Sequence, residues 1–272
     1  MKNKPNNSGW SGTSVDCDLI FLHGFLGLPS DWKALLGSPS LEESIKNNET
    51  TGSLNFYCPD YFNIPSLSPN FPFQEFAKNF VQWVQSNTHS DRKILIGYSL
   101  GGRLALAVFE QAPEMFAKLF LLSTHPGLKS EEEKDLRRIN DSEWAKSFLS
   151  TNWEDLMQCW NQQSVFAGSK AEPQRQEMNF SREYLKLALE KWSLANQESK
   201  VLLIKNYFSQ IVYVVGKDDT KFTDLARQLL EQVPGLQCFI LKNSGHRVLF
   251  DQPEEIAKLL VQELFRSHRN LI

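Results

Sequence analysis

The sequence predicts an α/β protein in which a mostly parallel sheet is flanked by helices. Two observations support this prediction. Short, continuous apolar runs recur along the chain, and such runs are typical of strands buried on both faces of a sheet. Between them lie segments with apolar residues at helical spacing. Strands and helices that alternate in this way favour a parallel sheet covered on both sides.

Six apolar runs are predicted to be strands, at 18–22, 54–58, 93–97, 118–123, 211–215 and 236–241. Helices are predicted at 73–85, 100–111, 222–232 and 254–265. In the first of these helices, Phe73, Phe76, Ala77 and Phe80 repeat with a period near 3.6. The order of these elements gives a core built from residues 18–124 and 208–272.

Residues 125–207 interrupt this alternation. Their pattern is mostly helical, with many charges and four tryptophans at positions 144, 153, 160 and 192. A helical insertion near the strand ends is expected to form a cap over a site, and the alternative is that these helices only pad one edge of the sheet. The polar residues 1–17 are predicted to form a loose leader.

The composition excludes several classes of protein. The 272 residues are 41 % hydrophobic, which is too apolar for a disordered chain. The chain contains no run of about 18 apolar residues, so no membrane-spanning helix is predicted. A net charge of −3 gives no basic surface for nucleic acid or an anionic membrane. The four dispersed cysteines are expected to be reduced thiols, and the expected location is the cytoplasm.

The sharpest motif is Gly97-Tyr-Ser-Leu-Gly101, which fits G-x-S-x-G. It follows a predicted strand and opens a predicted helix, which is the context of a nucleophile elbow. The flanking glycines remove side chains that would collide in so sharp a turn. The helix N-terminus then presents N–H groups to developing negative charge. Ser99 is therefore the candidate nucleophile.

A serine nucleophile needs a base and an acid, which follow it in the order acid and then histidine. Of the five histidines, only His246 lies on a loop after the last predicted strand. The acid is expected after the previous strand, where position alone allows either Asp218 or Asp219. The order Ser99, Asp219, His246 makes His246 the base and Asp219 the group that fixes its tautomer.

The segment His23-Gly-Phe-Leu-Gly27 follows the first predicted strand. Its turn is expected to bring the amide of Phe25 beside the amide of Leu100, so that the two form an oxyanion site. His23 itself is interpreted as structural, holding the loop through a side-chain hydrogen bond. Together with the triad order, these motifs predict an α/β-hydrolase fold, which hosts many different reactions.

Five segments taken together resemble one family, the 2-succinyl-6-hydroxy-2,4-cyclohexadiene-1-carboxylate synthases of menaquinone biosynthesis. They are Leu22–Gly27, Gly97–Arg103, His125–Leu128, Trp160–Phe166 and Gly216–Phe222. The resemblance implies a lyase whose triad abstracts a proton beside a carbonyl-stabilised position and then eliminates pyruvate. It also implies a substrate with several carboxylates, and it implies no cofactor and no metal.

The resemblance further implies a set of substrate-binding residues. Its cations are Arg103, Arg137 and Lys221, which suit carboxylates, and its aromatic wall is Tyr98, Trp160 and Phe166. The chain departs from the family pattern at residues 58–63 and 247–250, and at Leu122-Ser-Thr124, where the family tends to have Glu-Gly-Gly. Such loops determine substrate specificity.

The leading hypothesis is therefore a lyase of this family acting on a small polycarboxylate. The alternative is a serine hydrolase of the carboxylesterase or thioesterase kind, acting on an unknown acyl compound. A third hypothesis is a binding protein without activity, which an intact triad argues against. The expected assembly is a monomer or a small homo-oligomer, with no nucleic acid partner and no membrane insertion.

Overall fold

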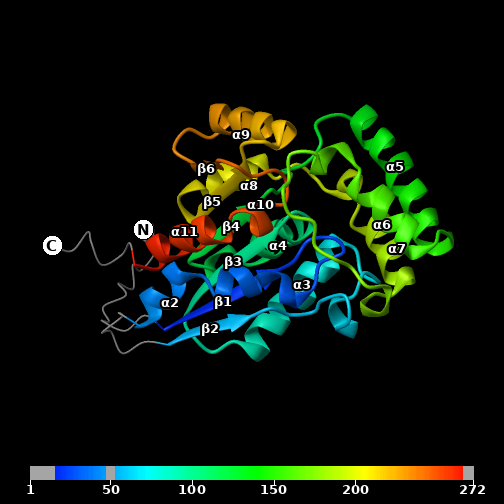
Figure 1. The fold of residues 1–272 in the computed structure, drawn as a ribbon. Helices are drawn as coiled ribbons and strands as arrows, with labels where there is room; N and C mark the ends of the chain where they lie inside the picture. The colour runs from blue at the N-terminus through cyan, green and yellow to red at the C-terminus, as the bar shows by residue number, and fades with distance from the viewer. Residues whose placement is uncertain (1–15, 47–52, 266–272) are drawn as a thin grey trace, which may run out of the picture.

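The computed structural model describes residues 16–46 and 53–265 (Figure 1). Within these ranges, six strands form one sheet in the order β2-β1-β3-β4-β5-β6, and every neighbouring pair is parallel. The strands are β1 (Cys17–Leu22), β2 (Leu54–Tyr57), β3 (Arg92–Tyr98), β4 (Lys118–Leu122), β5 (Ile211–Gly216) and β6 (Gln237–Leu241). The predicted α/β class is confirmed, and each predicted strand is present with small changes at its ends.

Helices cover both faces of the sheet, as the buried clusters on its two sides show. One face packs against α3 (Phe73–Asn87), α4 (Leu100–Gln111) and α9 (Thr220–Gln232). The other face packs against α1 (Lys33–Leu36), α2 (Pro39–Lys46), α10 (Val248–Asp251) and α11 (Pro253–Phe265). Along β1, Ile20 and Leu22 belong to the first cluster and Leu19 and Phe21 to the second, as the period of two in a strand requires.

Between β4 and β5, residues 123–210 are all described and form no strand. Their α-helices are α5 (Glu131–Ser150), α6 (Trp153–Asn161), α7 (Arg182–Lys191) and α8 (Val201–Asn206). Helix α5 begins with a capping box, because the Ser130 hydroxyl accepts from the Glu133 N–H and the Glu133 carboxylate accepts from the Ser130 N–H. Figure 1 shows α5, α6 and α7 gathered to one side of the sheet.

Most of the predicted leader, residues 1–15, lies outside the described residues, and β1 already begins at Cys17. No helix in the described part of the chain combines the length and the apolar character that a membrane crossing requires.

Candidate active site

Ser99 occupies the sharp turn between β3 and α4. Its backbone is left-handed, with φ 53° and ψ −111°, and its N–H donates to the Leu122 carbonyl at 2.8 Å. The turn also brings α4 against β1. A Cβ on Gly101 would lie 2.1 Å from the Leu22 carbonyl oxygen and 2.3 Å from that of His23. Only glycine fits this approach, which explains the second glycine of G-x-S-x-G.

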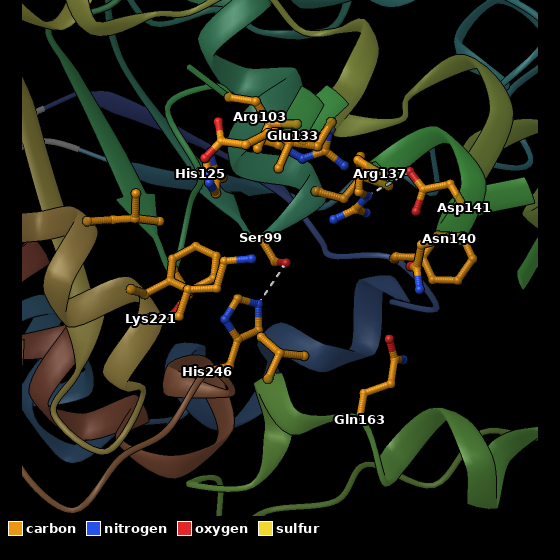
Figure 2. A pocket seen from close by; sticks show the side chains of 18 of the residues that line it. Ser99, Arg103, His125, Glu133, Arg137, Asn140, Asp141, Gln163, Lys221 and His246 are labelled. Carbon is orange, nitrogen blue, oxygen red and sulfur yellow. Dashed lines mark hydrogen bonds and ion pairs between the residues drawn. The ribbon is translucent and has the colours of Figure 1, made fainter. Parts of the chain in front are cut away.

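Three side chains form a continuous hydrogen-bonded chain that we call the triad: Ser99, His246 and Asp219. The Ser99 Oγ lies 3.0 Å from His246 Nε2 (Figure 2), and His246 Nδ1 lies 2.8 Å from an Asp219 carboxylate oxygen. Since the carboxylate can only accept, Nδ1 carries the proton and Nε2 is left to accept from the serine hydroxyl. This is the tautomer that a general base beside a hydroxyl requires.

The sequence position allows either Asp218 or Asp219 to be the acid of the triad. In the structure their contacts differ. Asp219 contacts the imidazole, whereas the Asp218 N–H donates to the Ser244 carbonyl, and its own carbonyl lies against Gly168. Asp219 is also the N-cap of α9, because its second carboxylate oxygen accepts from the Phe222 N–H at 3.2 Å. One oxygen therefore fixes the helix start while the other orients His246.

Phe25 and Leu100 both line the cavity beside Ser99. Leu100 is the first residue of α4, so its N–H has no partner within the helix and lies at the positive end of the helix dipole. The loop that carries Phe25 is closed by the Gly27 N–H donating to the Gly24 carbonyl at 3.0 Å. These two backbone segments can present N–H groups to an oxygen held next to Ser99.

His23 is fully buried and supports this loop. Its Nδ1 lies 2.9 Å from the Gly24 carbonyl, and its ring stacks on Tyr61 at a centroid distance of 4.3 Å. Burial lowers the pKa of His23, because the charged imidazolium would lose its hydration. The ring is therefore neutral at physiological pH.

Lowering the pH below about 6.5 is expected to destabilise the protein through His23. The unfolded chain then binds a proton that the native state does not. The free energy of unfolding should fall by up to about 1.4 kcal/mol per pH unit until the lowered folded pKa is reached. Urea titrations between pH 4 and pH 8 measure this slope. In His23→Asn the slope should be shallower, whereas His89→Asn, at an exposed histidine, should match the wild type; equal slopes in all three would contradict the assignment.

Ser99 lies at the edge of a cavity of about 820 Å³. Residues of α5, α7 and α9 also line this cavity. Three of its lining residues, Arg103, Arg137 and Lys221, are called here the cation cluster. Arg103 is buried and donates to the Trp192 carbonyl at 2.8 Å. Burial, followed by the charge of Arg137, lowers the pKa of Arg103 to about 9, which leaves it cationic at neutral pH. Burial and Arg137 likewise lower the pKa of Lys221.

The predicted aromatic wall is present in part. The Trp160 ring lies 4.9 Å from that of Phe25, and the Phe166 ring lies 6.3 Å from Trp160 and 5.9 Å from His246. Tyr98 is different, because it does not line the cavity. Its buried ring packs toward Phe250, with centroids 6.1 Å apart, on the opposite side of the sheet. Tyr98 is thus not among the residues that line the cavity, but its ring also lies 6.1 Å from that of His246, and its place in the substrate wall stays a prediction.

Sequence reasoning missed further lining residues on α5. Glu133, Asn140 and Asp141 face the cavity together with Arg137, and the Arg137 Nε donates to Asp141 at 2.8 Å. Glu133 and Asp141 lie four residues on either side of Arg137, and Asn140 lies three residues after it, so the four residues mark one face of a helix. This spacing was visible in the sequence once Arg137 was singled out, although the face also carries ordinary surface charges.

A second missed feature is the segment 161–175, which we call the strap. It leaves α6 and runs across the loop that carries His246. Arg247 donates to the Ala171 carbonyl at 3.0 Å and to Asn161 Oδ1, and its guanidinium lies 4.2 Å above the Phe166 ring. Asp251 accepts from the Lys170 and Ala171 N–H groups at 3.0 and 2.9 Å.

The far end of the strap is held by a buried ion pair. Arg175 donates through both terminal nitrogens to the Asp31 carboxylate, at 2.7 and 2.8 Å. The strap thus connects α6 to the loop after β1 and to the loop that carries His246. Arg247, at the start of the 247–250 segment, makes three of these contacts, which are two hydrogen bonds and one contact with an aromatic ring.

Within residues 16–46 and 53–265, no three His, Cys, Asp or Glu side chains lie close enough together to hold a metal ion. All four cysteines are free thiols, and burial raises the pKa of Cys17 and of Cys58 to about 12, which disfavours the thiolate.

Comparison with known proteins identifies the family of the chain. The model of the Alpha/beta hydrolase family matches residues 19–259. The 2-succinyl-6-hydroxy-2,4-cyclohexadiene-1-carboxylate synthase of Citrobacter koseri is 31 % identical over 90 % of this chain and 93 % of its own. The protein of that name from Salmonella newport is 32 % identical with the same coverage.

Solved structures show the same fold. MenH from S. aureus superposes with a TM-score of 0.77 at 19 % identity, covering 94 % of this chain and 95 % of that chain. A thermophilic esterase from Thermogutta terrifontis follows with a TM-score of 0.64 at 18 % identity, over 94 % and 92 %. The chain belongs to the alpha/beta hydrolase family and, within it, to the family of 2-succinyl-6-hydroxy-2,4-cyclohexadiene-1-carboxylate synthases.

Proposed function

We propose that the protein is a lyase of menaquinone biosynthesis that eliminates pyruvate from a cyclohexene polycarboxylate. The product would be 2-succinyl-6-hydroxy-2,4-cyclohexadiene-1-carboxylate, the compound for which the relatives are named. The observation that carries this proposal is a triad opening into a cavity that holds the cation cluster. A polycarboxylate needs fixed cations of this kind, and a simple ester does not.

The triad supplies the proton transfer. The Ser99 oxygen takes the ring proton beside the carbonyl while its own proton passes to His246 Nε2. The resulting imidazolium is stabilised by the Asp219 carboxylate at Nδ1. Negative charge that develops on the substrate carbonyl oxygen is met by the N–H groups of Phe25 and Leu100.

Elimination then completes the reaction. The electron pair left on the ring carbon forms the second ring double bond as the carbon–oxygen bond to the enolpyruvyl group breaks. The departing enolate takes the proton from His246 and tautomerises to pyruvate, which restores the triad. The cation cluster holds the carboxylates during both the proton transfer and the elimination, and it fixes the ring against Ser99.

We further propose that residues 125–207 act as the cap and that residues 18–124 and 208–272 form the core; of the core residues, 47–52 and 266–272 lie outside the described part of the chain. The contribution of α5 and α7 to the cavity supports this division. The free thiols support a cytoplasmic protein.

Pyruvate release by the purified protein tests the function. A lactate dehydrogenase coupled assay with the cyclohexene substrate should show turnover without added metal or cofactor. The competing function is a serine hydrolase, which the same triad geometry would serve. It predicts a burst with a short activated ester and an acyl adduct on Ser99 in the mass spectrum, and such a burst without pyruvate release would favour it.

Removing the charge of Arg137 is expected to lower kcat/KM for pyruvate release about 10- to 100-fold, mainly through KM. This is the effect of losing a charge-assisted bond to carboxylate. Arg103→Ala should cost at least as much, because Arg103 is the more buried of the two. Arg138→Ala is the matched control, since Arg138 pairs with Asp135 on the exposed side of α5. Unchanged kinetics in Arg137→Ala and Arg103→Ala would contradict the role of the cation cluster.

A further inference from the structure

The loop after β4 carries a polar side chain that the proposed mechanism leaves unused. Ser123 lines the cavity, is fully buried, and has no hydrogen-bond partner for its Oγ among the described residues. Its backbone is left-handed, with φ 46°, a conformation that costs a non-glycine residue free energy. A buried hydroxyl without a partner in the protein is unfavourable unless a ligand or a water molecule supplies one.

His125, two residues later, lines the same cavity (Figure 2). Its Nδ1 accepts from the Gly127 N–H at 3.1 Å, so the ring proton of the neutral imidazole is on Nε2. The turn requires glycine at 127, where φ is 129° and a Cβ would lie 2.6 Å from the Ser199 Cα. The loop thus fixes His125 as an N–H donor at its other ring nitrogen.

Burial and the positive charges around His125 keep its imidazole neutral. Burial, followed by Lys221, Arg103, Arg137 and Lys129, lowers the pKa of His125 to about 3. Glu133, which also lines the cavity, accepts from the backbone N–H groups of Lys129 and Ser130. A neutral donor in this position adds hydrogen bonds to an anion without adding another desolvated charge.

The intervening residue, Thr124, points elsewhere. Its hydroxyl donates to the Leu122 carbonyl at 3.2 Å, and its side chain packs against Gly102 of α4. Thr124 does not line the cavity. It therefore offers a matched hydroxyl, adjacent in sequence, that lies outside the site.

We propose that the Ser123 hydroxyl and the Nε2–H of His125 form a carboxylate subsite of two neutral donors at the end of β4. It would bind one carboxylate of the substrate, while the cation cluster supplies the charge. A carboxylate fits because it accepts at two oxygens, and its bonds to neutral donors are strengthened by its charge. This inference rests on the proposed function for the identity of the substrate.

Binding of a stable ligand tests the subsite separately from turnover. The probe is 2-succinylbenzoate, the aromatic dicarboxylate that results when the proposed product loses water. Its dissociation constant is measured by calorimetry for the wild type, Ser123→Ala and His125→Asn. Asn can still accept from the Gly127 N–H but lacks a donor at the Nε2 position. Both variants should bind the probe at least about tenfold more weakly.

Two controls make the test specific. His125→Gln keeps an amide donor near the Nε2 position, and Thr124→Val removes the adjacent hydroxyl that faces α4. Both should bind the probe within about threefold of the wild type. Ser123→Gly removes the hydroxyl but accepts the left-handed backbone, so it should melt at a higher temperature and still bind weakly. A structural role alone would instead make Ser123→Gly bind as the wild type does.

The outcomes separate this inference from the proposed function. Wild-type affinity in Ser123→Ala, Ser123→Gly and His125→Asn would overturn the subsite, even if pyruvate is released. Failure of the wild type to bind the probe would overturn it as well. Weakened binding in these variants without pyruvate release would support the subsite and count against the lyase.

Discussion

Replacing Ser99 with alanine is expected to lower pyruvate release by at least about a thousandfold. The substitution removes the oxygen that relays the proton to His246, and positioned acid–base groups typically contribute 10²–10⁴-fold. The cavity and the cation cluster stay intact, so KM and the affinity for 2-succinylbenzoate should change little. Single-turnover pyruvate release measures the effect.

Ser244→Ala is the control for this result. Ser244 is a buried serine on the loop that precedes His246, and its hydroxyl makes only a 3.3 Å contact to the Gly245 carbonyl. It should keep near wild-type turnover. Retention of more than about a tenth of the activity in Ser99→Ala would contradict the proton relay. In the wild-type protein, a stable covalent adduct on Ser99 would instead indicate nucleophilic catalysis.

Replacing Gly101 with alanine is expected to destabilise the fold by about 3 kcal/mol or more. The added Cβ would lie 2.1 Å and 2.3 Å from two carbonyl oxygens at the end of β1, and neither backbone atom can move without displacing the strand. In an ordinary helix position the same change would stabilise the protein. Urea denaturation at constant pH gives the free energy of unfolding.

Gly37→Ala serves as the comparison. There the nearest heavy atom to a new Cβ is the Lys33 carbonyl oxygen at 3.3 Å, and φ is an ordinary −92°. Its stability should lie within about 1 kcal/mol of the wild type. If Gly101→Ala behaves in the same way, the close approach of α4 to β1 is not what selects glycine at this position.

The parts of the fold that sequence predicts are those with local signals. The apolar run before Gly97 and the helical pattern from Leu100 to Gln111 gave the strand, the turn and the helix that place Ser99. The chain order of the motifs then placed His246. The choice between Asp218 and Asp219 was open, because both follow the same strand and only the turn geometry separates them.

The remaining features depend on contacts between distant segments. Tyr98 is the last residue of β3 and precedes Ser99, so its sequence position suits either the cavity or the core. In the structure its ring lies 6.1 Å from the rings of both His246 and Phe250. Arg247 finds its partners 76 and 86 positions earlier in the chain. No periodicity or motif reports such a pairing. The sequence does not distinguish Ser123 from other serines, because its left-handed backbone and its hydroxyl without a partner are visible only in the structure.

The strap links helix α6 to the loop that carries His246, so thermal detachment of the strap must disturb the position of the imidazole. Partial unfolding starts in the segments with the weakest protection, and residues 161–175 lie outside the sheet. Heat should then inactivate the enzyme by releasing Arg247 and Asp251 from the strap before the strands separate. The highest temperature at which this chain works would thus be set by the attachment of the strap and lie below the melting temperature of its sheet.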